Sequence, residues 1–450
     1  MFQVSYYLVD ELNADAAMVN TYSAITYLPW CLKIFFGVFS DCVPIMGWHR
    51  RPYFISGWVV FVLSNIWLWI DGSPGTTSIF LLSFVMSMGY LQADTVADAM
   101  IVEATANEVE SAKGRMRTQG YLIRSVGMTI GGLMGACLYN KAEWGWGMTI
   151  GQCFLVQALL PLVTLFPTMP FMHEIKYRGE ISTFKQKWTE SWNFVVTDAV
   201  WIPLMYLYFY NFCYVSNPAW YNFLYDGLNF SDFQVGILYT IGSLLGALGI
   251  WMYDTCFFSQ GWRTLYMWTT VVSTLFSFLQ LCLLYGWTAG MPNIVFATGD
   301  VSLQSAVQYI SFMPMCIMFL AMIPDGQEGT LYAMITTWQN VAAEVAYDIG
   351  TLLECAVTNT SNEAIEEGHW GGLIKLTYIT SAVQIFPIFF IYCKYKGVAC
   401  LPNSTVETKA QWDAEKTSYS GAFLFMFLFI GSIAASMFEA VYVIYYPGAC

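Results

Sequence analysis

Long apolar segments separated by short polar ones make up almost the whole chain. Twelve of them come close to or exceed the roughly 20 residues that an α-helix needs to cross the hydrocarbon core of a bilayer. The predicted membrane-spanning helices cover residues 17–39, 53–70, 77–102, 118–139, 148–171, 199–217, 232–254, 264–286, 306–323, 331–356, 371–393 and 420–446. Residues 1–9 are apolar but too few to cross, and we interpret them as the end of a truncated first helix. The pattern predicts an all-α membrane protein.

Composition agrees with a membrane environment. The 450 residues are 57% hydrophobic and only 11% charged, whereas a soluble domain carries about 25% charged residues. The 18 Trp and 29 Tyr fit the aromatic belts that form at membrane interfaces. We therefore expect a multi-pass protein of the plasma membrane or an organelle membrane. The net charge of −13 argues against a nucleic-acid partner.

Residues that carry enzyme chemistry are scarce. The 12 cysteines are scattered, without the paired spacings of a metal site or a disulfide framework. His49, His173 and His369 are the only histidines, and all lie in predicted loops. The sequence contains no phosphate-binding loop, dinucleotide-binding motif or nucleophile elbow. We expect neither an enzyme nor a bound metal or cofactor.

The basic residues predict the orientation. Fourteen of the 18 Lys and Arg, including Arg115 and Arg117, fall in one set of loops, and the opposite loops hold only Lys141. Cytoplasmic loops carry the excess of basic residues, so residues 173–198 are predicted to be cytosolic and residues 357–369 external. The glycosylation sequons at Asn229 and Asn359 then lie outside, and the one at Asn403 inside.

The chain is predicted to form two pseudo-symmetric halves. Residues 1–172 are the N-terminal half, 173–198 a cytosolic linker, 199–395 the C-terminal half, and 396–450 a cytosolic segment with an extra helix. Gly37 to Asp41 followed by Gly47-Trp-His-Arg50 has a faint counterpart in Gly249 to Asp254 followed by Gly261-Trp-Arg263. Parallel repeats of this kind are expected of a major facilitator bundle.

Four ionisable residues lie inside the predicted spans at a similar depth, in the cytosolic half of the membrane: Lys33, Asp94, Asp98 and Arg124. The two aspartates are one turn apart on the same helix face. Ionisable groups in spans usually face a bundle interior or a water-filled cavity and mark a pathway. The alternative is an ion-pair network that serves stability alone.

Two further sets of charges are candidates. Asp41, Arg50 and Arg51 lie at the cytosolic end, where they would pair between helices as a gate, although topology alone also explains the arginines. Glu344 and Asp348 form a second acidic pair one turn apart and are candidates for the C-terminal half of a cavity.

Several motifs, taken together and in order, resemble those of a known family. They include Pro29-Trp30-x-x-Lys33, the segment from Gly37 to Tyr53, Asp94-x-x-x-Asp98, Gly120 to Gly127, Phe296 to Asp300, Phe312-Met-Pro314 and Gly329 to Ala333. Over roughly residues 1–395 the chain resembles the folate–biopterin transporters of the major facilitator superfamily. The segment 420–446 lies beyond their usual twelve helices.

The resemblance implies import or exchange of folates or pterins, commonly driven by protons, although some relatives carry metabolites such as S-adenosylmethionine. Arg124 or Lys33 would hold a substrate carboxylate, and Asp94 or Asp98 would bind the pterin ring and the coupling proton. We expect a monomer in a lipid bilayer. A sugar transporter and, from another class, a receptor that does not transport remain alternatives.

Overall fold

The structure is a computed structural model, and it describes most of the chain. The described residues are 4, 7, 8, 11, 12, 16–105, 108–109, 114–139, 144–172, 174, 176, 183–320, 322–323, 327–358, 360, 362–414 and 416–445. Most of residues 1–9, which we interpreted as the end of a truncated first helix, lie outside the described residues. The sequon residue Asn359 also lies outside them.

The described chain is almost entirely helical. Its first part contains α2 (Ala16–Cys31), α3 (Lys33–Cys42), α4 (Arg51–Asp71), α5 (Thr76–Thr105), α6 (Arg115–Leu138), α8 (Ile150–Thr164) and the short η2 (Met169–Phe171). The middle contains α9 (Phe184–Val196), α10 (Asp198–Phe212), α11 (Ala219–Asn222), η3 (Phe223–Gly227), α12 (Asp232–Met252), η4 (Tyr253–Phe257), α13 (Trp262–Leu284) and α14 (Asn293–Met318). The remainder contains α15 (Glu328–Leu352), η5 (Leu353–Thr358), α16 (Asn362–Glu366), α17 (Gly371–Val383), η6 (Phe386–Phe390), the hairpin β1 (Lys394–Tyr395) and β2 (Val398–Ala399), α18 (Thr405–Trp412) and α19 (Tyr419–Tyr445).

Each of the twelve predicted segments overlaps at least one of these helices. Eight helices within the described residues are long and apolar enough to cross a membrane. The predicted segments 17–39, 199–217, 331–356 and 420–446 are outside this set. The first is interrupted, the second forms only 15 residues of α10, and the apolar stretch of the last is shorter than a full span.

The interruption in segment 17–39 separates α2 from α3. Pro29 has no backbone N–H and its ring crowds the preceding turn, which bends a helix. One turn later, the N–H of Leu32 donates to the carbonyl of Pro29 at 2.9 Å, and Lys33 begins the next helix. The predicted start of 306–323 was wrong, because α14 begins at Asn293.

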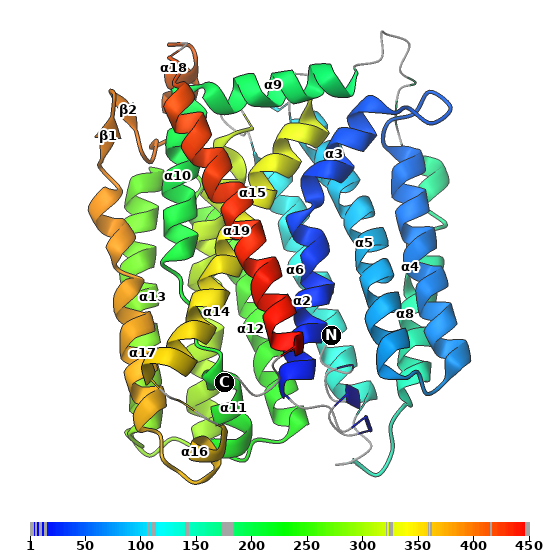
Figure 1. Cartoon of the computed structure of the whole chain (residues 1–450), viewed down its shortest axis with the longest axis vertical. Coiled ribbons are helices and arrows are strands. Elements are labelled where there is room, and N and C mark those ends of the chain that lie inside the picture. The colour runs from blue at the N-terminus through cyan, green and yellow to red at the C-terminus, as the bar shows by residue number, and fades with distance from the viewer. Residues whose placement is uncertain are drawn as a thin grey trace.

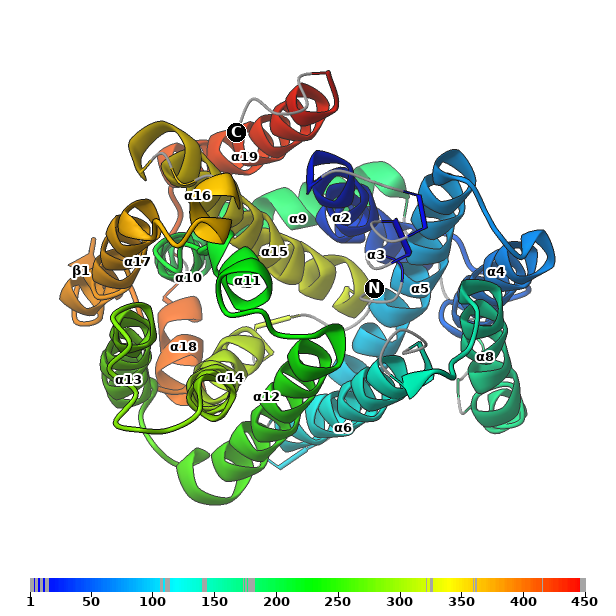
Figure 2. The same ribbon diagram turned by 90° about the horizontal axis from the view of Figure 1, so that it is seen from below.

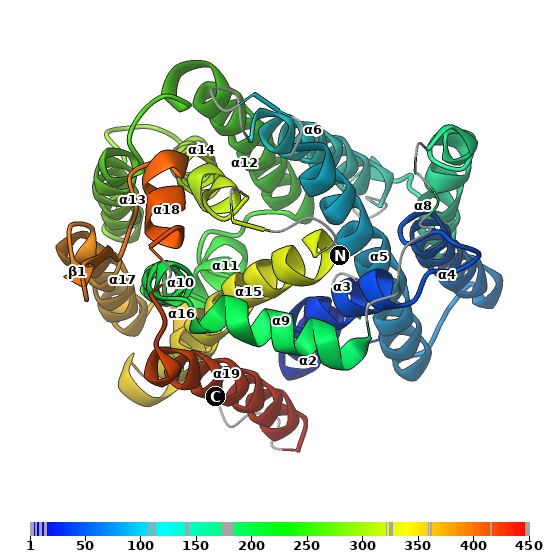
Figure 3. The same ribbon diagram turned by 90° about the horizontal axis from the view of Figure 1, so that it is seen from above.

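The helices stand side by side in one bundle (Figure 1). Seen from below and from above, α2 to α8 occupy one side and α10 to α17 the other (Figures 2 and 3). Two seams join the sides: α6 packs against α12, and α3 packs against α15. At the second seam, a Cβ on Gly37 would overlap the carbonyl group of Gly329, so these helices approach as closely as glycine allows. The division into halves at residues 173–198 stays a prediction.

Within the predicted linker, residues 184–196 are helical. They form α9, which crosses the top of the bundle at a steep angle to the other helices (Figures 1 and 3). The segment after β2 is tied to it, because the N–H of Ser418 donates to the carbonyl of Val196 at 2.9 Å. From there α19 runs down the side of the bundle, where Phe425 stacks on Trp338 of α15 at 3.9 Å between ring centroids.

Candidate substrate site and gate

Three helices bring five charged side chains together. Lys33 lies at the start of α3, Asp94 and Asp98 lie on α5, and Arg117 and Arg124 lie on α6. The Lys33 Nζ contacts Asp94 Oδ2 at 2.8 Å and Asp98 Oδ2 at 2.5 Å. Arg124 Nη1 contacts Asp94 Oδ1 at 2.9 Å, and Arg117 Nη1 contacts Asp98 Oδ1 at 2.8 Å. Each carboxylate oxygen therefore has one cationic partner.

The cluster contains one more cation than it has carboxylates. Most of it is buried: the side chains of Lys33, Arg117, Asp94 and Asp98 are 3%, 2%, 9% and 8% exposed. Arg124 differs, since 31% of its side chain is exposed. The guanidinium group of an arginine can donate two parallel hydrogen bonds to one carboxylate. The cluster can therefore receive an anion, and Arg124 is the member that an anion can reach.

Sequence reasoning missed Arg117. We assigned it to a cytosolic loop because it stands beside Arg115 in a basic stretch, but α6 already begins at Arg115 and Arg117 is buried. The spacing of the arginines along the sequence could have identified it. Arg117 and Arg124 are seven residues apart, which places them on the same helix face two turns from each other.

Aromatic rings line the charge cluster. The Arg124 guanidinium lies 5.7 Å and the Lys33 ammonium 5.9 Å from the Trp30 ring centroid, within the range of a cation–π contact. Arg117 lies between Tyr121, at 4.5 Å, and Tyr332 of α15, at 4.4 Å. A flat aromatic ligand with an anionic group would find stacking surfaces and a cation in one place.

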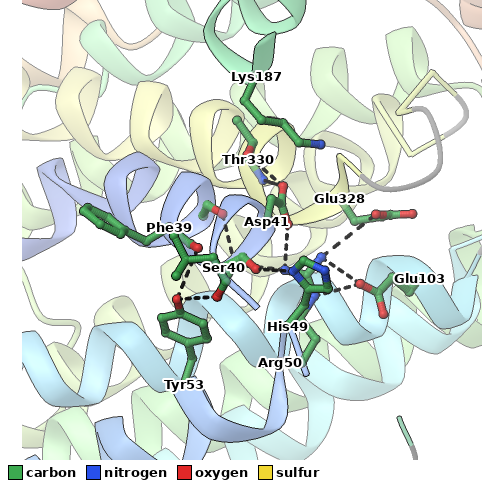
Figure 4. A network of polar contacts seen from close by, with 12 residues as sticks. Phe39, Ser40, Asp41, His49, Arg50, Tyr53, Glu103, Lys187, Glu328 and Thr330 are labelled. Atoms are coloured by element: carbon green, nitrogen blue, oxygen red, sulfur yellow. Dashed lines mark hydrogen bonds and ion pairs between the residues drawn. The ribbon is translucent and has the colours of Figure 1, made fainter. Parts of the chain in front are cut away.

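A second network of polar contacts lies at the end of the bundle that carries α9 (Figure 4). Arg50 donates from Nη1 to Asp41 Oδ1 at 2.7 Å and from Nε to Glu103 Oε1 at 2.8 Å. The other oxygen of Asp41 accepts hydrogen bonds from Thr330, from its backbone N–H at 2.8 Å and its hydroxyl at 2.7 Å. Arg50 also lies 4.0 Å from Glu328.

Asp41 acts as an N-terminal cap for a helix on the opposite side of the bundle. Thr330 lies in the first turn of α15, where backbone N–H groups have no partner within the helix and attract negative charge. Burial alone would lower the pKa of Arg50, but Asp41 and Glu103 raise it above its ordinary value. The guanidinium therefore stays charged at physiological pH, and the network does not open by its titration.

The structure does not bring Arg51 into this network. Within the described residues, its guanidinium lies over the Trp48 ring at 5.9 Å, and its backbone N–H donates to Glu174 at 2.8 Å. Glu174 also accepts the N–H groups of His49 and Arg50, at 2.7 and 2.8 Å, so it caps the start of α4. The predicted gating trio thus separates into a bonded pair, Asp41 and Arg50, and a neighbour.

The ion pairs described above for the charge cluster do not include Glu344 or Asp348. Both residues are on the part of α15 that faces α2, where Glu344 lies close to Tyr27 and Cys31. One turn before Glu344, the Asn340 side-chain amide donates to the carbonyl of Trp30 at 3.5 Å. The acidic pair therefore borders the seam that contains Trp30, and its role in a cavity stays a prediction.

Known proteins resemble the chain over most of its length. A family model described as the BT1 family matches residues 1–412. A folate-biopterin transporter of Synechocystis sp. is 24% identical over 405 residues, which cover 86% of this chain and 76% of the relative. Folate transporter 1 of Plasmodium falciparum is 23% identical over 432 residues, which cover 92% of this chain and 80% of the relative.

Solved structures share the architecture. A D-xylose–proton symporter aligns with a TM-score of 0.61 at 16% identity, covering 92% of this chain and 94% of the other. A bacterial homologue of the iron transporter ferroportin, in an outward-facing state, aligns with a TM-score of 0.53 at 14% identity, covering 85% and 93%. At such identities the likeness shows the fold alone, and it confirms the predicted major facilitator bundle.

Proposed function

Because the chain belongs to the BT1 family, we propose that it moves folates or pterins across its membrane by proton-coupled alternating access. It is a multi-pass integral membrane transporter and not an enzyme. The observation that carries the choice of substrate is the buried cluster of three cations and two carboxylates beside Trp30.

Folates have the chemistry that this cluster recognises. A folate carries carboxylates at one end and a flat pterin ring with N–H donors at the other. Arg124 is exposed enough to bind a carboxylate, and Trp30 offers a stacking surface next to it. The carboxylate oxygens of Asp94 and Asp98 would accept hydrogen bonds from the pterin ring, with Lys33 holding both in position.

The same contacts suggest how proton and substrate binding are linked. A substrate carboxylate at Arg124 takes away one partner of Asp94, whereas Asp98 keeps both Arg117 and Lys33. Of the two aspartates that we propose as proton carriers, Asp94 is thus the one that the substrate frees. Substrate and proton would bind with positive coupling, and this coupling would be reciprocal.

Alternating access requires the seam between α3 and α15 to open and close. We assign this gate to Asp41, which binds the first turn of α15, and to Arg50, which holds Asp41 and reaches Glu328. In the opposite state these bonds would break as the two sides rock about the central site.

Uptake into proteoliposomes tests the proposal. Labelled folate should accumulate when the pH gradient is imposed in one direction and only equilibrate without it. Biopterin and S-adenosylmethionine, tested in parallel, identify the substrate, and a sugar serves as a neutral comparison. Saturable folate binding without any uptake would indicate a receptor and contradict the proposal.

A further inference from the structure

A large apolar cavity lies outside the proposed site, between α3, α9, α15 and α19. Its volume is about 900 Å³. Its walls are almost entirely hydrophobic, and they include Leu32, Phe35, Trp188, Met334, Phe429 and Ile430. Phe35 and Ile430 remain 56% and 60% exposed although they line it, so protein atoms do not fill the space. Because the space is open and its lining offers almost no polar group, a hydrophobic molecule fits it better than ordered water does.

The cavity follows one face of α19. The residues of α19 that line it run from Phe425 to Met437 at helical spacing. Twelve residues of α-helix rise about 18 Å, and half of the hydrocarbon core of a bilayer is about 15 Å thick. The cavity therefore has the length of an acyl chain in one leaflet.

One end of the cavity lies under α9 and carries a positive charge. Phe184, Lys185, Trp188 and Trp192 line it, and all four lie on one face of this amphipathic helix. Amphipathic helices with Lys and Trp lie in the plane of the membrane interface, at the level of the lipid headgroups. Lys185 is thus placed to meet a phosphate while the acyl chains extend along α19.

We propose that this cavity binds a phospholipid of the leaflet in which α9 lies, with its phosphate at Lys185 and its acyl chains between α3 and α19. Two of the walls belong to opposite sides of the gate, since Phe35 lies on α3 and Met334 on α15. The cavity has its present shape only while this seam is closed, so a bound phospholipid favours the closed gate. This inference is independent of which solute is transported.

Native mass spectrometry of the full chain in mild detergent tests the site, with dioleoyl phosphatidylserine and phosphatidylcholine as probes. The protein should retain one phospholipid, and Ala434→Trp, which fills the cavity, should lower the apparent affinity at least tenfold. Leu275→Trp, on the exposed face of α13, is the matched control and should bind as the unaltered protein does. Ile430→Trp replaces Ala434→Trp if that variant does not fold.

The headgroup contact is tested separately. Lys185→Glu should weaken phospholipid binding and remove any preference for phosphatidylserine, whereas Lys409→Glu, on the exposed surface of α18, should not. Arg50→Ala should also lower retention if the cavity depends on the closed gate. The proposal would be overturned if the unaltered protein and the cavity-filling variant retained equal amounts of phospholipid. It would also be overturned if Lys185→Glu and Lys409→Glu had the same effect on phospholipid binding.

Discussion

At the residue scale, the buried carboxylates of Asp94 and Asp98 are the strongest indication of a binding site. Burying ion pairs in place of apolar side chains gains little stability, so the cluster is better explained by ligand binding than by stability alone. Its members also differ in accessibility. Arg117 and Lys33 are almost fully buried, whereas the Arg124 side chain is 31% exposed. Structural and ligand-binding roles are therefore expected to fall on different residues.

Arg124→Ala should weaken binding of a carboxylate-bearing folate more than of a neutral pterin. A hydrogen bond to a charged group contributes about 1.5–3 kcal/mol, so the difference should be about 10- to 100-fold in Kd. Calorimetry with both ligands measures it. Trp30→Ala is the comparison and should weaken both ligands. An equal loss for folate and pterin in Arg124→Ala would show that this arginine does not hold the carboxylate.

Asp98→Asn should, in addition to any effect on binding, lower the stability of the protein. It leaves the buried Arg117 without its only carboxylate partner among the described residues, and breaking a buried pair costs about 3–5 kcal/mol. The melting temperature of this variant should fall well below that of Arg124→Ala, whose cation is partly solvated. Similar melting temperatures for the two variants would contradict the division of roles.

At the scale of helices, the proposed gate depends on contacts between elements that the sequence does not show. The motif from Gly37 to Arg51 pointed to the cytosolic end of a helix pair, but the partner of Asp41 is the first turn of α15, 289 residues away. Adjacent arginines also look equivalent in sequence. Arg50 turns into the network, whereas Arg51 lies over Trp48, although Glu174 accepts the backbone N–H of both residues.

Arg50→Ala should slow transport while leaving the equilibrium affinity for substrate within a few-fold, because the gate lies outside the proposed binding site. Arg51→Ala is the matched control and should transport close to the normal rate. Uptake rates and equilibrium binding, measured on the same preparations, separate the two effects. A loss of affinity in Arg50→Ala as large as its loss of transport would place Arg50 in the binding site.

The helices themselves were largely predictable, because apolar length is a strong signal in a membrane protein. Their ends and breaks were less so. The polar residues from Asn293 to Asp300 hid the first turns of α14, and the basic stretch at Arg115 hid the start of α6. The charge cluster was predicted from four of its five members. Arg117 was missed because a cation next to the membrane boundary looks the same whether it turns outward or inward.

At the scale of the whole molecule, orientation follows from charge. Of the 18 basic residues, the sequence assigns 14 to one set of loops, and 13 of these remain once Arg117 is placed inside α6. This excess predicts that α9 lies on the cytosolic side and α16 outside. In intact cells, a cysteine at Glu366 should react with an impermeant thiol reagent, and one at Lys185 should react only after permeabilisation. Reaction of Lys185→Cys from outside would reverse the topology and, with it, the side on which the gate closes.

Under the proposed mechanism, Asp94 takes up a proton when a substrate carboxylate occupies Arg124. The most direct measurement is proton uptake by the purified protein on adding folate, in a weakly buffered solution with a pH-sensitive dye. The unaltered protein should take up close to one proton for each folate bound. Asp94→Asn should bind folate without proton uptake, whereas the same uptake in both proteins would contradict the account.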